Sequence, residues 1–158
     1  MTQTDPVSGA GRRRFFLLAG TALACGAAIY LKVGTQSPTT TETISARDAH
    51  DAVRAGRVVL IDIREPEEWA ETGIPEGAHA IDMRRPDFTE AVKALVRDDP
   101  DTQVALICAR GVRSARMSER LSSAGLTNIV DVSEGMLGSA SGPGWLALNL
   151  PTETARAE

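Results

Sequence analysis

The residues best suited to chemistry form one short segment, Cys108-Ala109-Arg110-Gly111-Val112-Arg113-Ser114. It follows an apolar run at 104–107 and precedes a helical pattern, so Cys108 is expected where a buried strand ends and a helix begins. Amides at the helix start, together with Arg110 and Arg113, would favour a negatively charged, nucleophilic sulfur. The alternative is an inert core thiol, which is the commoner fate of a lone cysteine.

The sequence offers few residues for a metal site, a disulfide scaffold, a histidine-based site or a nucleic-acid interface. The only two cysteines, Cys25 and Cys108, do not have the spacing of a zinc module or a disulfide scaffold, so no metal or cofactor is expected. The only two histidines, His50 and His79, are both interpreted as surface residues. The net charge of −4 excludes a whole-protein positive field that would recruit nucleic acid. Any affinity for anions must therefore come from a local cluster.

Residues 1–32 have a targeting pattern that is distinct from the rest of the chain. Three arginines at 12–14 precede seventeen uncharged residues, 15–31, and the string resembles a twin-arginine export signal, although Gly11 replaces the usual Ser or Thr. The run is shorter than the ~20 residues of a typical spanning helix, so a cleaved signal peptide and a retained membrane anchor are both open. Arginines held in the cytoplasm predict a periplasmic or extracellular position for the rest. Cys25 fits a lipidation motif only loosely, and we interpret it as a buried thiol.

The remaining chain is expected to contain one folded domain. Hydrophobic residues make up 42% and charged residues 24% of the sequence, which is an ordinary globular balance. Residues 33–43 are polar and Thr-rich, which indicates a flexible linker. The domain is then predicted at 44–151, followed by a disordered tail at 152–158.

Strand and helix patterns alternate along the predicted domain. Helices are expected at 46–55, 66–69, 88–96 and 112–124, and strands at 58–61, 80–81, 104–107 and 129–132. Such alternation requires right-handed crossovers, so the sheet should be parallel and covered by helices on both faces. The predicted fold class is α/β.

Four ordered motifs along 44–151 resemble the rhodanese homology family. Residues 61–69 are similar to its Asp-x-Arg-x-x-x-Glu-Trp/Tyr motif, and 108–114 to its Cys-x-x-Gly-x-Arg-Ser active loop. Residues 73–78 resemble Gly-His-Ile-Pro-Gly-Ala without the histidine and with Glu76 inserted. Residues 135–138 and Trp145 resemble a Gly-Gly…Trp ending, with Glu134 where the first glycine often stands.

The resemblance implies a small parallel sheet of about five strands flanked by helices, provided that a weak strand precedes Ser45. It also implies that Cys108 attacks the outer sulfur of a donor such as thiosulfate, releases sulfite, holds a persulfide and passes its sulfur to cyanide or a thiol. The expected residues that cradle the anionic donor are Ala109, Arg110, Gly111, Val112, Arg113 and Ser114. No further cysteine follows in the predicted domain, so the acceptor should be external.

Several side chains around this loop are expected to support it. Asp62 and Arg64 match a strand-end pair of the family and are interpreted as a structural brace. Glu68 could belong to the same network or to a solvated helix face, and we interpret it as the latter. Trp69 and Trp145 are interpreted as packing residues. Ser114 could either cap the helix or bond to the sulfur, and the sequence leaves both open.

Two other functions compete with sulfur transfer. Cysteine phosphatases of a related fold have five residues between Cys and Arg, whereas four separate Cys108 from Arg113 here. The shorter loop suits sulfur better than a tetrahedral phosphate. A non-catalytic binding or sulfur-carrier module is the other alternative, although the presence of Cys108, Gly111 and Arg113 argues against a degenerate domain.

Overall fold

The computed structural model describes residues 1–2 and 41–155. The predicted twin-arginine-like segment, the arginines at 12–14, Cys25 and most of the predicted linker lie outside the described residues. Within the described part, no helix has the length and apolar character needed to cross a membrane.

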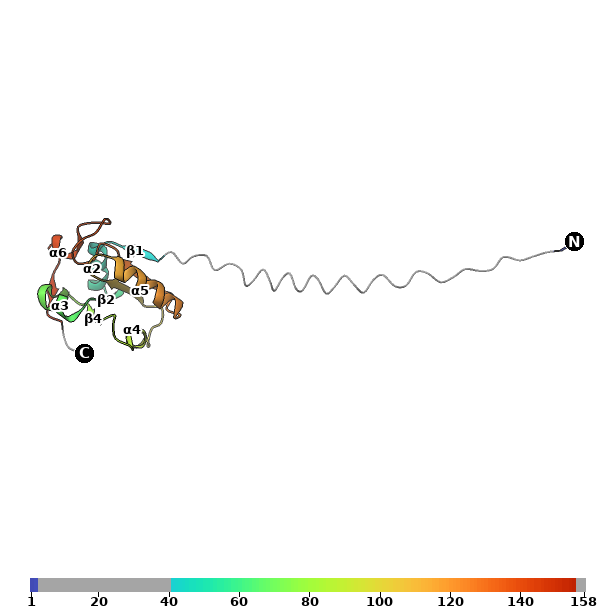
Figure 1. The fold of residues 1–158 in the computed structure, drawn as a ribbon, viewed down its shortest axis with the longest axis horizontal. Helices are drawn as coiled ribbons and strands as arrows, with labels where there is room; N and C mark the ends of the chain where they lie inside the picture. Colours follow the sequence, from blue (N-terminus) through green and yellow to red (C-terminus); the bar gives the residue numbers. More distant parts are fainter. Residues whose placement is uncertain (3–40, 156–158) are drawn as a thin grey trace. The chain divides into compact units, whose positions relative to one another are not determined.

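Five parallel strands form the central sheet (Figure 1). They are β1 (Glu42–Ile44), β2 (Val58–Asp62), β4 (His79–Ala80), β5 (Gln103–Ile107) and β6 (Ile129–Val132), in the spatial order β1-β6-β5-β2-β4. The predicted α/β class and the parallel sheet of five strands are confirmed, including the weak strand before Ser45. The predicted linker at 33–43 is corrected at its end, because residues 42 and 43 pair with β6. An edge strand pairs through its backbone, so its polar composition resembles that of a linker.

Helices cover both faces of this sheet (Figure 1). They are α2 (Ala46–Arg54), α3 (Pro66–Thr72), α4 (Phe88–Leu95), α5 (Val112–Ser123) and α6 (Gly144–Ala147). Ser45 caps α2, since its hydroxyl accepts a hydrogen bond from the Asp48 amide at 3.0 Å. α3 begins at Pro66 as expected and continues one turn further than predicted. Its start is stabilised by reciprocal bonds between Glu65 and Glu68.

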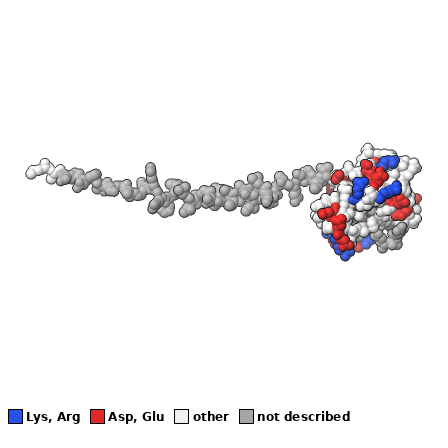
Figure 2. All heavy atoms as spheres, turned by 180° about the vertical axis from the view of Figure 1, so that it is seen from behind, with Lys and Arg blue, Asp and Glu red and all other residues white. Residues whose placement is uncertain are grey.

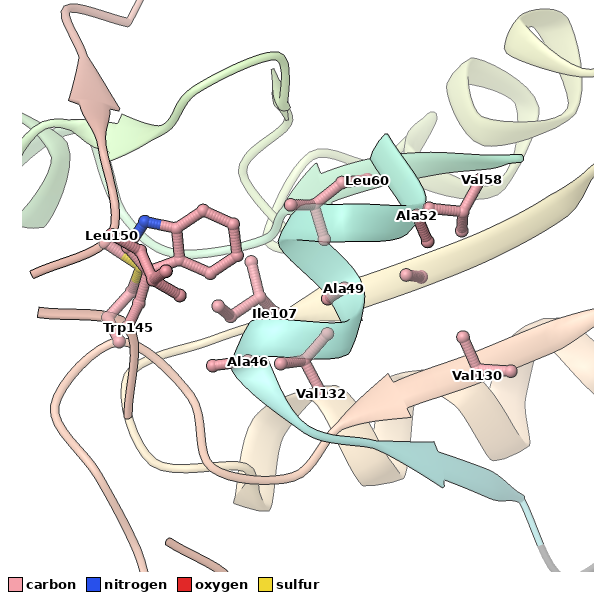
Figure 3. Close-up of a cluster of buried hydrophobic side chains, with 12 residues drawn as sticks. Ala46, Ala49, Ala52, Val58, Leu60, Ile107, Val130, Val132, Trp145 and Leu150 are labelled. Atoms are coloured by element: carbon pink, nitrogen blue, oxygen red, sulfur yellow. The ribbon is translucent and has the colours of Figure 1, made fainter. Parts of the chain in front are cut away.

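Two apolar cores lie on opposite faces of the sheet because side chains alternate along each strand. One core joins α2 and α6 to the sheet, with Trp145 fully buried beside Ile107 and Leu150 (Figure 3). The other core joins α4 and α5 to the sheet and includes Cys108. Trp145 is therefore confirmed as a packing residue, and its indole N–H donates to the Pro151 carbonyl at 2.9 Å.

The structure corrects two further predictions. The predicted disordered tail is wrong at its start, because β7 (Thr152–Glu153) pairs antiparallel with β3 (Ile74–Pro75). Strands of two residues are too short to show a periodic pattern. The surface assignment of His50 is also wrong, since it is 9% exposed and meets the Trp145 ring edge-on at 5.7 Å. Its partner lies nearly a hundred residues away, so the local pattern carried no signal of this contact.

Candidate active site

Cys108 lies immediately after β5, at the carboxyl edge of the sheet. It is 1% exposed, and its side chain belongs to the core on the α5 face. The seven-residue segment that begins with it turns back and becomes the first turn of α5. This is the position expected from the sequence, and it is the edge at which open α/β sheets bind ligands.

Backbone contacts with the turn after β6 fix the shape of the loop. The Cys108 carbonyl accepts from the Met136 amide, and the Ala109 carbonyl accepts from the Leu137 amide, both at 2.9 Å. Gly111 has a φ of +79°, and a Cβ there would lie 2.2 Å from the Ser133 carbonyl oxygen. Only glycine fits both the conformation and the space at this position.

The loop presents a row of backbone N–H groups. Within the described residues, no amide from Ala109 to Ser114 donates to a protein acceptor. The last three of these amides begin α5, whose twelve residues place a partial positive charge at this end. Successive open amides leading into a helix form a concave anion site, so the loop can hold an anionic donor or an anionic sulfur.

The two arginines of the loop have different environments. Arg113 is paired with the Glu68 carboxylate through contacts of 2.6 and 2.8 Å, and this pairing lowers the pKa of Glu68. Arg110 is exposed and makes only a long contact of 3.4 Å to the Gly138 carbonyl. The prediction of Glu68 as a solvated helix face is wrong, because the fold brings α3 against the loop. Arg110 is thus the loop cation that no carboxylate holds among the described residues.

Ser114 lies against the sulfur. Its hydroxyl is 3.4 Å from the Cys108 Sγ and 3.1 Å from the Gly111 carbonyl, and the residue is fully buried. The N-cap of α5 is Gly111, and the cap makes no side-chain hydrogen bond. Of the two roles left open by the sequence, the geometry favours contact with the sulfur.

Asp62 and Arg64 form a buried pair behind the loop. Three contacts of 2.6 to 3.0 Å join the guanidinium to the carboxylate. Burial raises the pKa of Asp62, and the neighbouring Arg64 opposes that rise. The same guanidinium donates to the Thr72 hydroxyl and the Gly73 carbonyl, at 2.9 and 2.8 Å. The pair therefore fixes the end of α3, the helix whose Glu68 holds Arg113.

Sequence reasoning missed two buried carboxylates near the site. The Glu134 carboxylate accepts from the amides of Ala46 at 3.3 Å and Gly144 at 2.9 Å, and so joins the first residues of α2 and α6. The sequence signal for Glu134 was its position in the Gly-Gly…Trp ending, where the first glycine often stands. Asp131 lies in the middle of β6 and is 3% exposed, and burial raises its pKa. Its signal was a charge inside an otherwise apolar strand.

Charge on one face of the molecule is mixed. On the face shown in Figure 2, acidic and basic side chains lie interspersed rather than in a patch of one sign. No group of three His, Cys, Asp or Glu side chains in the described part of the chain could hold a metal ion. Among the described residues, the Cys108 loop combines amides without a protein acceptor and an arginine that no carboxylate holds, and this combination suits anion chemistry.

Comparisons with known proteins agree with this fold. A family model described as "Rhodanese-like domain" matches residues 45–140. A putative sulfurtransferase, YtwF, of Bacillus subtilis is 37% identical over 78 residues, which cover 49% of this chain and 69% of that protein. The crystal structure of a rhodanese-related protein from Thermoplasma volcanium is 32% identical with a TM-score of 0.55, covering 72% of this chain and 98% of that one. The polysulfide-sulfur transferase homodimer of Wolinella succinogenes shares the fold at 22% identity and a TM-score of 0.53, covering 88% and 94%.

Proposed function

Because this chain belongs to the family of rhodanese-like domains, we propose that it is a sulfurtransferase in which Cys108 carries sulfur as a persulfide. The donor would be a small sulfur anion such as thiosulfate, and the acceptor cyanide or an external thiol. The observation that carries the proposal is that Cys108 begins a loop, at the carboxyl edge of the sheet, whose amides have no protein acceptor among the described residues. The similarity to a putative sulfurtransferase of Bacillus subtilis supports the same class of reaction.

The proposed reaction has two displacements at sulfur. The Cys108 thiolate attacks the outer sulfur of thiosulfate, a new S–S bond forms, and the original S–S bond breaks with its electron pair leaving on sulfite. The acceptor then attacks the outer persulfide sulfur, and Cys108 leaves as a thiolate. The loop amides and the Arg110 side chain would hold the negative charge in both steps.

The acceptor is proposed to be a separate molecule. Cys108 is the only cysteine in the described residues, so no second thiol stands near it there to form an internal disulfide. Cys25, the other cysteine, lies in the N-terminal segment outside that part. A Cys25–Cys108 disulfide found by mass spectrometry in the purified protein would contradict this part of the proposal.

One ion pair and the length of the loop disfavour the phosphatase alternative. A phosphatase loop needs its arginine on the phosphate oxygens, but Arg113 is held by Glu68 through both guanidinium nitrogens. The four residues between Cys108 and Arg113 also make a smaller cradle than five would. Hydrolysis of a phosphoester at a rate comparable to sulfur transfer would reverse this ranking.

The test is thiosulfate:cyanide sulfurtransferase activity of the full-length protein beside Cys108→Ser, with Cys25→Ser as a matched control. We expect thiocyanate production and one added sulfur on the peptide containing Cys108, both lost in Cys108→Ser and both retained in Cys25→Ser. Failure of Cys108 to take up sulfur from thiosulfate or from a polysulfide would instead support a non-catalytic binding module.

A further inference from the structure

Asp131 is a buried carboxyl on the same face of the sheet as the reactive cysteine. Its neighbours along β6, Val130 and Val132, belong to the core beneath α2. Alternation of side chains places Asp131 on the opposite face, which α5 covers. It is in register with Leu106 of β5, and Cys108 follows two residues later on that same face. The carboxyl thus lies in the layer directly behind the active loop.

The α5 side of this layer is polar as well. Ser114 and Ser118 are one helical turn apart, so both point from the same face of α5, and both are fully buried. The Ser118 hydroxyl and one oxygen of Asp131 have no hydrogen-bond partner among the described atoms. Burial raises the pKa of the Asp131 carboxyl, and the nearby Ser114 hydroxyl opposes that rise. A buried carboxyl so weakly satisfied is costly for stability alone, which points to a role in the site.

The Ser114 hydroxyl has more acceptors than protons. It lies 3.4 Å from the Cys108 Sγ and 3.1 Å from the Gly111 carbonyl, and the Asp131 carboxyl, which faces α5 from β6, is near enough for the hydroxyl to lower its pKa. A hydroxyl has one proton to donate, so these bonds exclude one another at any moment. An ionised Asp131 attracts that proton more strongly than a neutral one, because charge-assisted hydrogen bonds are the stronger ones.

We propose that Asp131 is a positioning residue that directs the Ser114 hydroxyl and so controls how strongly the Cys108 sulfur holds negative charge. With Asp131 neutral, the hydroxyl donates to the sulfur and stabilises a thiolate. With Asp131 ionised, the carboxylate takes the hydroxyl and adds a negative charge behind the sulfur. The two anions therefore oppose each other, and a sulfur that becomes anionic draws a proton from solvent onto Asp131.

Few other charges face this pair from the elements packed against it. The charged side chains of α5 are Arg113, Arg116, Glu119 and Arg120; the first is paired with Glu68 and the others are exposed. Of the strands beside β6, β5 carries none and β1 carries only the exposed Glu42. Arg110 of the loop is exposed. Asp131 is therefore the one buried charge on the α5 side of the sheet in the described domain.

The inference deepens the proposed sulfur transfer, yet its test does not depend on turnover. The readout is the ultraviolet absorbance of the Cys108 thiolate against pH in the full-length protein, after subtraction of the matching Cys108→Ser protein. This subtraction removes the signal of Cys25. Titration follows the coupling even if no donor ever loads Cys108, so failure of one proposal is distinct from failure of the other.

We expect Asp131→Asn to lower the midpoint of the thiolate titration by about one pH unit, equal to a tenfold larger thiolate fraction below the midpoint. Ser114→Ala should raise the midpoint, because the sulfur loses its donor. In the Ser114→Ala background, Asp131→Asn should give a smaller shift, since only the direct charge effect remains. An unchanged midpoint in Asp131→Asn, or an equal shift in both backgrounds, would overturn the proposal.

A second neutral substitution at position 131 separates the effect of the carboxyl from an effect on folding. Asp131→Val places a β-branched apolar side chain in a buried strand, where such residues pack well. It should lower the midpoint as Asp131→Asn does, with near-ultraviolet circular dichroism used to check the fold of each variant. Opposite shifts from the two neutral substitutions would mean that packing, and not the carboxyl, sets the thiolate titration.

Discussion

Two arginine–carboxylate pairs support the cysteine loop, and they differ in their access to water. The Asp62–Arg64 pair has side-chain exposures of 0% and 1%, whereas the Glu68–Arg113 pair has 29% and 30%. Both pairs meet at α3, because Arg64 donates to the Glu68 and Gly73 carbonyls, and the Glu68 side chain binds Arg113. A buried pair cannot lose one member without leaving an isolated charge in a dry site, but a half-exposed pair can be solvated. The first should therefore govern stability and the second the orientation of the loop.

The largest expected effect is that of Arg64→Leu on stability, and it tests the role of the buried pair. It leaves the buried Asp62 without its partner, so the free energy of unfolding should fall by about 3–5 kcal/mol in urea denaturation. Lys93→Ala is the control, because it removes an exposed pair with Glu90 and should cost less than about 1 kcal/mol. Equal losses in the two variants would show that burial does not set the difference. Adding Asp62→Leu to Arg64→Leu should recover part of the lost stability.

Substitution of Gly111 tests whether the cysteine loop is held rigidly, and Gly125, which lies after α5, provides the control. Gly111 and Gly125 both have positive φ, but a Cβ at Gly111 would clash with the Ser133 carbonyl, and one at Gly125 meets nothing within 4 Å. Gly125→Ala should cost about 1–2 kcal/mol for its backbone conformation alone. Gly111→Ala should cost about 1–3 kcal/mol more and should also lose sulfur loading of Cys108. Equal stability of the two variants would mean that the loop can shift freely.

Glu68→Gln tests whether the Glu68–Arg113 pair orients the loop. It weakens the hold on Arg113, so kcat/KM for sulfur transfer should fall about tenfold as the loop loses its orientation. The free energy of unfolding should change by less than about 1 kcal/mol, because the pair is half-exposed. Glu67→Gln, an exposed neighbour on α3, is the matched control for activity. A faster enzyme after Glu68→Gln would instead mean that the pair restrains Arg113.

The smallest expected effect is the pH dependence of this half-exposed pair. The folded pKa of Glu68 is lowered from an ordinary value of 4.5, chiefly by its hydrogen bond to Arg113. The contribution of the pair is therefore complete above pH 4.5 and is lost as the pH falls through the lower folded pKa. The difference in unfolding free energy between wild type and Glu68→Gln should be largest at neutral pH and should shrink in acid. A difference that grew in acid would have the wrong sign for this pair.

The core strands could be read from the sequence, and the edge strands could not. The runs predicted at 58–61, 104–107 and 129–132 lie within one residue of β2, β5 and β6, because strands buried on both faces are apolar without interruption. β1 and β7 have polar residues that resemble a linker and a tail. Their strand conformation depends on partners elsewhere in the chain. β1 pairs with residues 130–132 of β6, and β7 pairs with Ile74 and Pro75 of β3.

The amino-acid order by itself determined which residues make up the cysteine loop. A nucleophile, a glycine and two arginines stand within six residues between a strand and a helix. The shape of this loop was not determined by its sequence alone, because contacts with the turn after β6 fix it. Only the tertiary structure decided which arginine is held by a carboxylate, and which carboxyl lies behind the sulfur. Glu68 is 45 residues from Arg113 and Asp131 is 23 residues from Cys108. Burial and ion pairing depend on distance in space and on the exclusion of water, and neither is set by spacing along the chain.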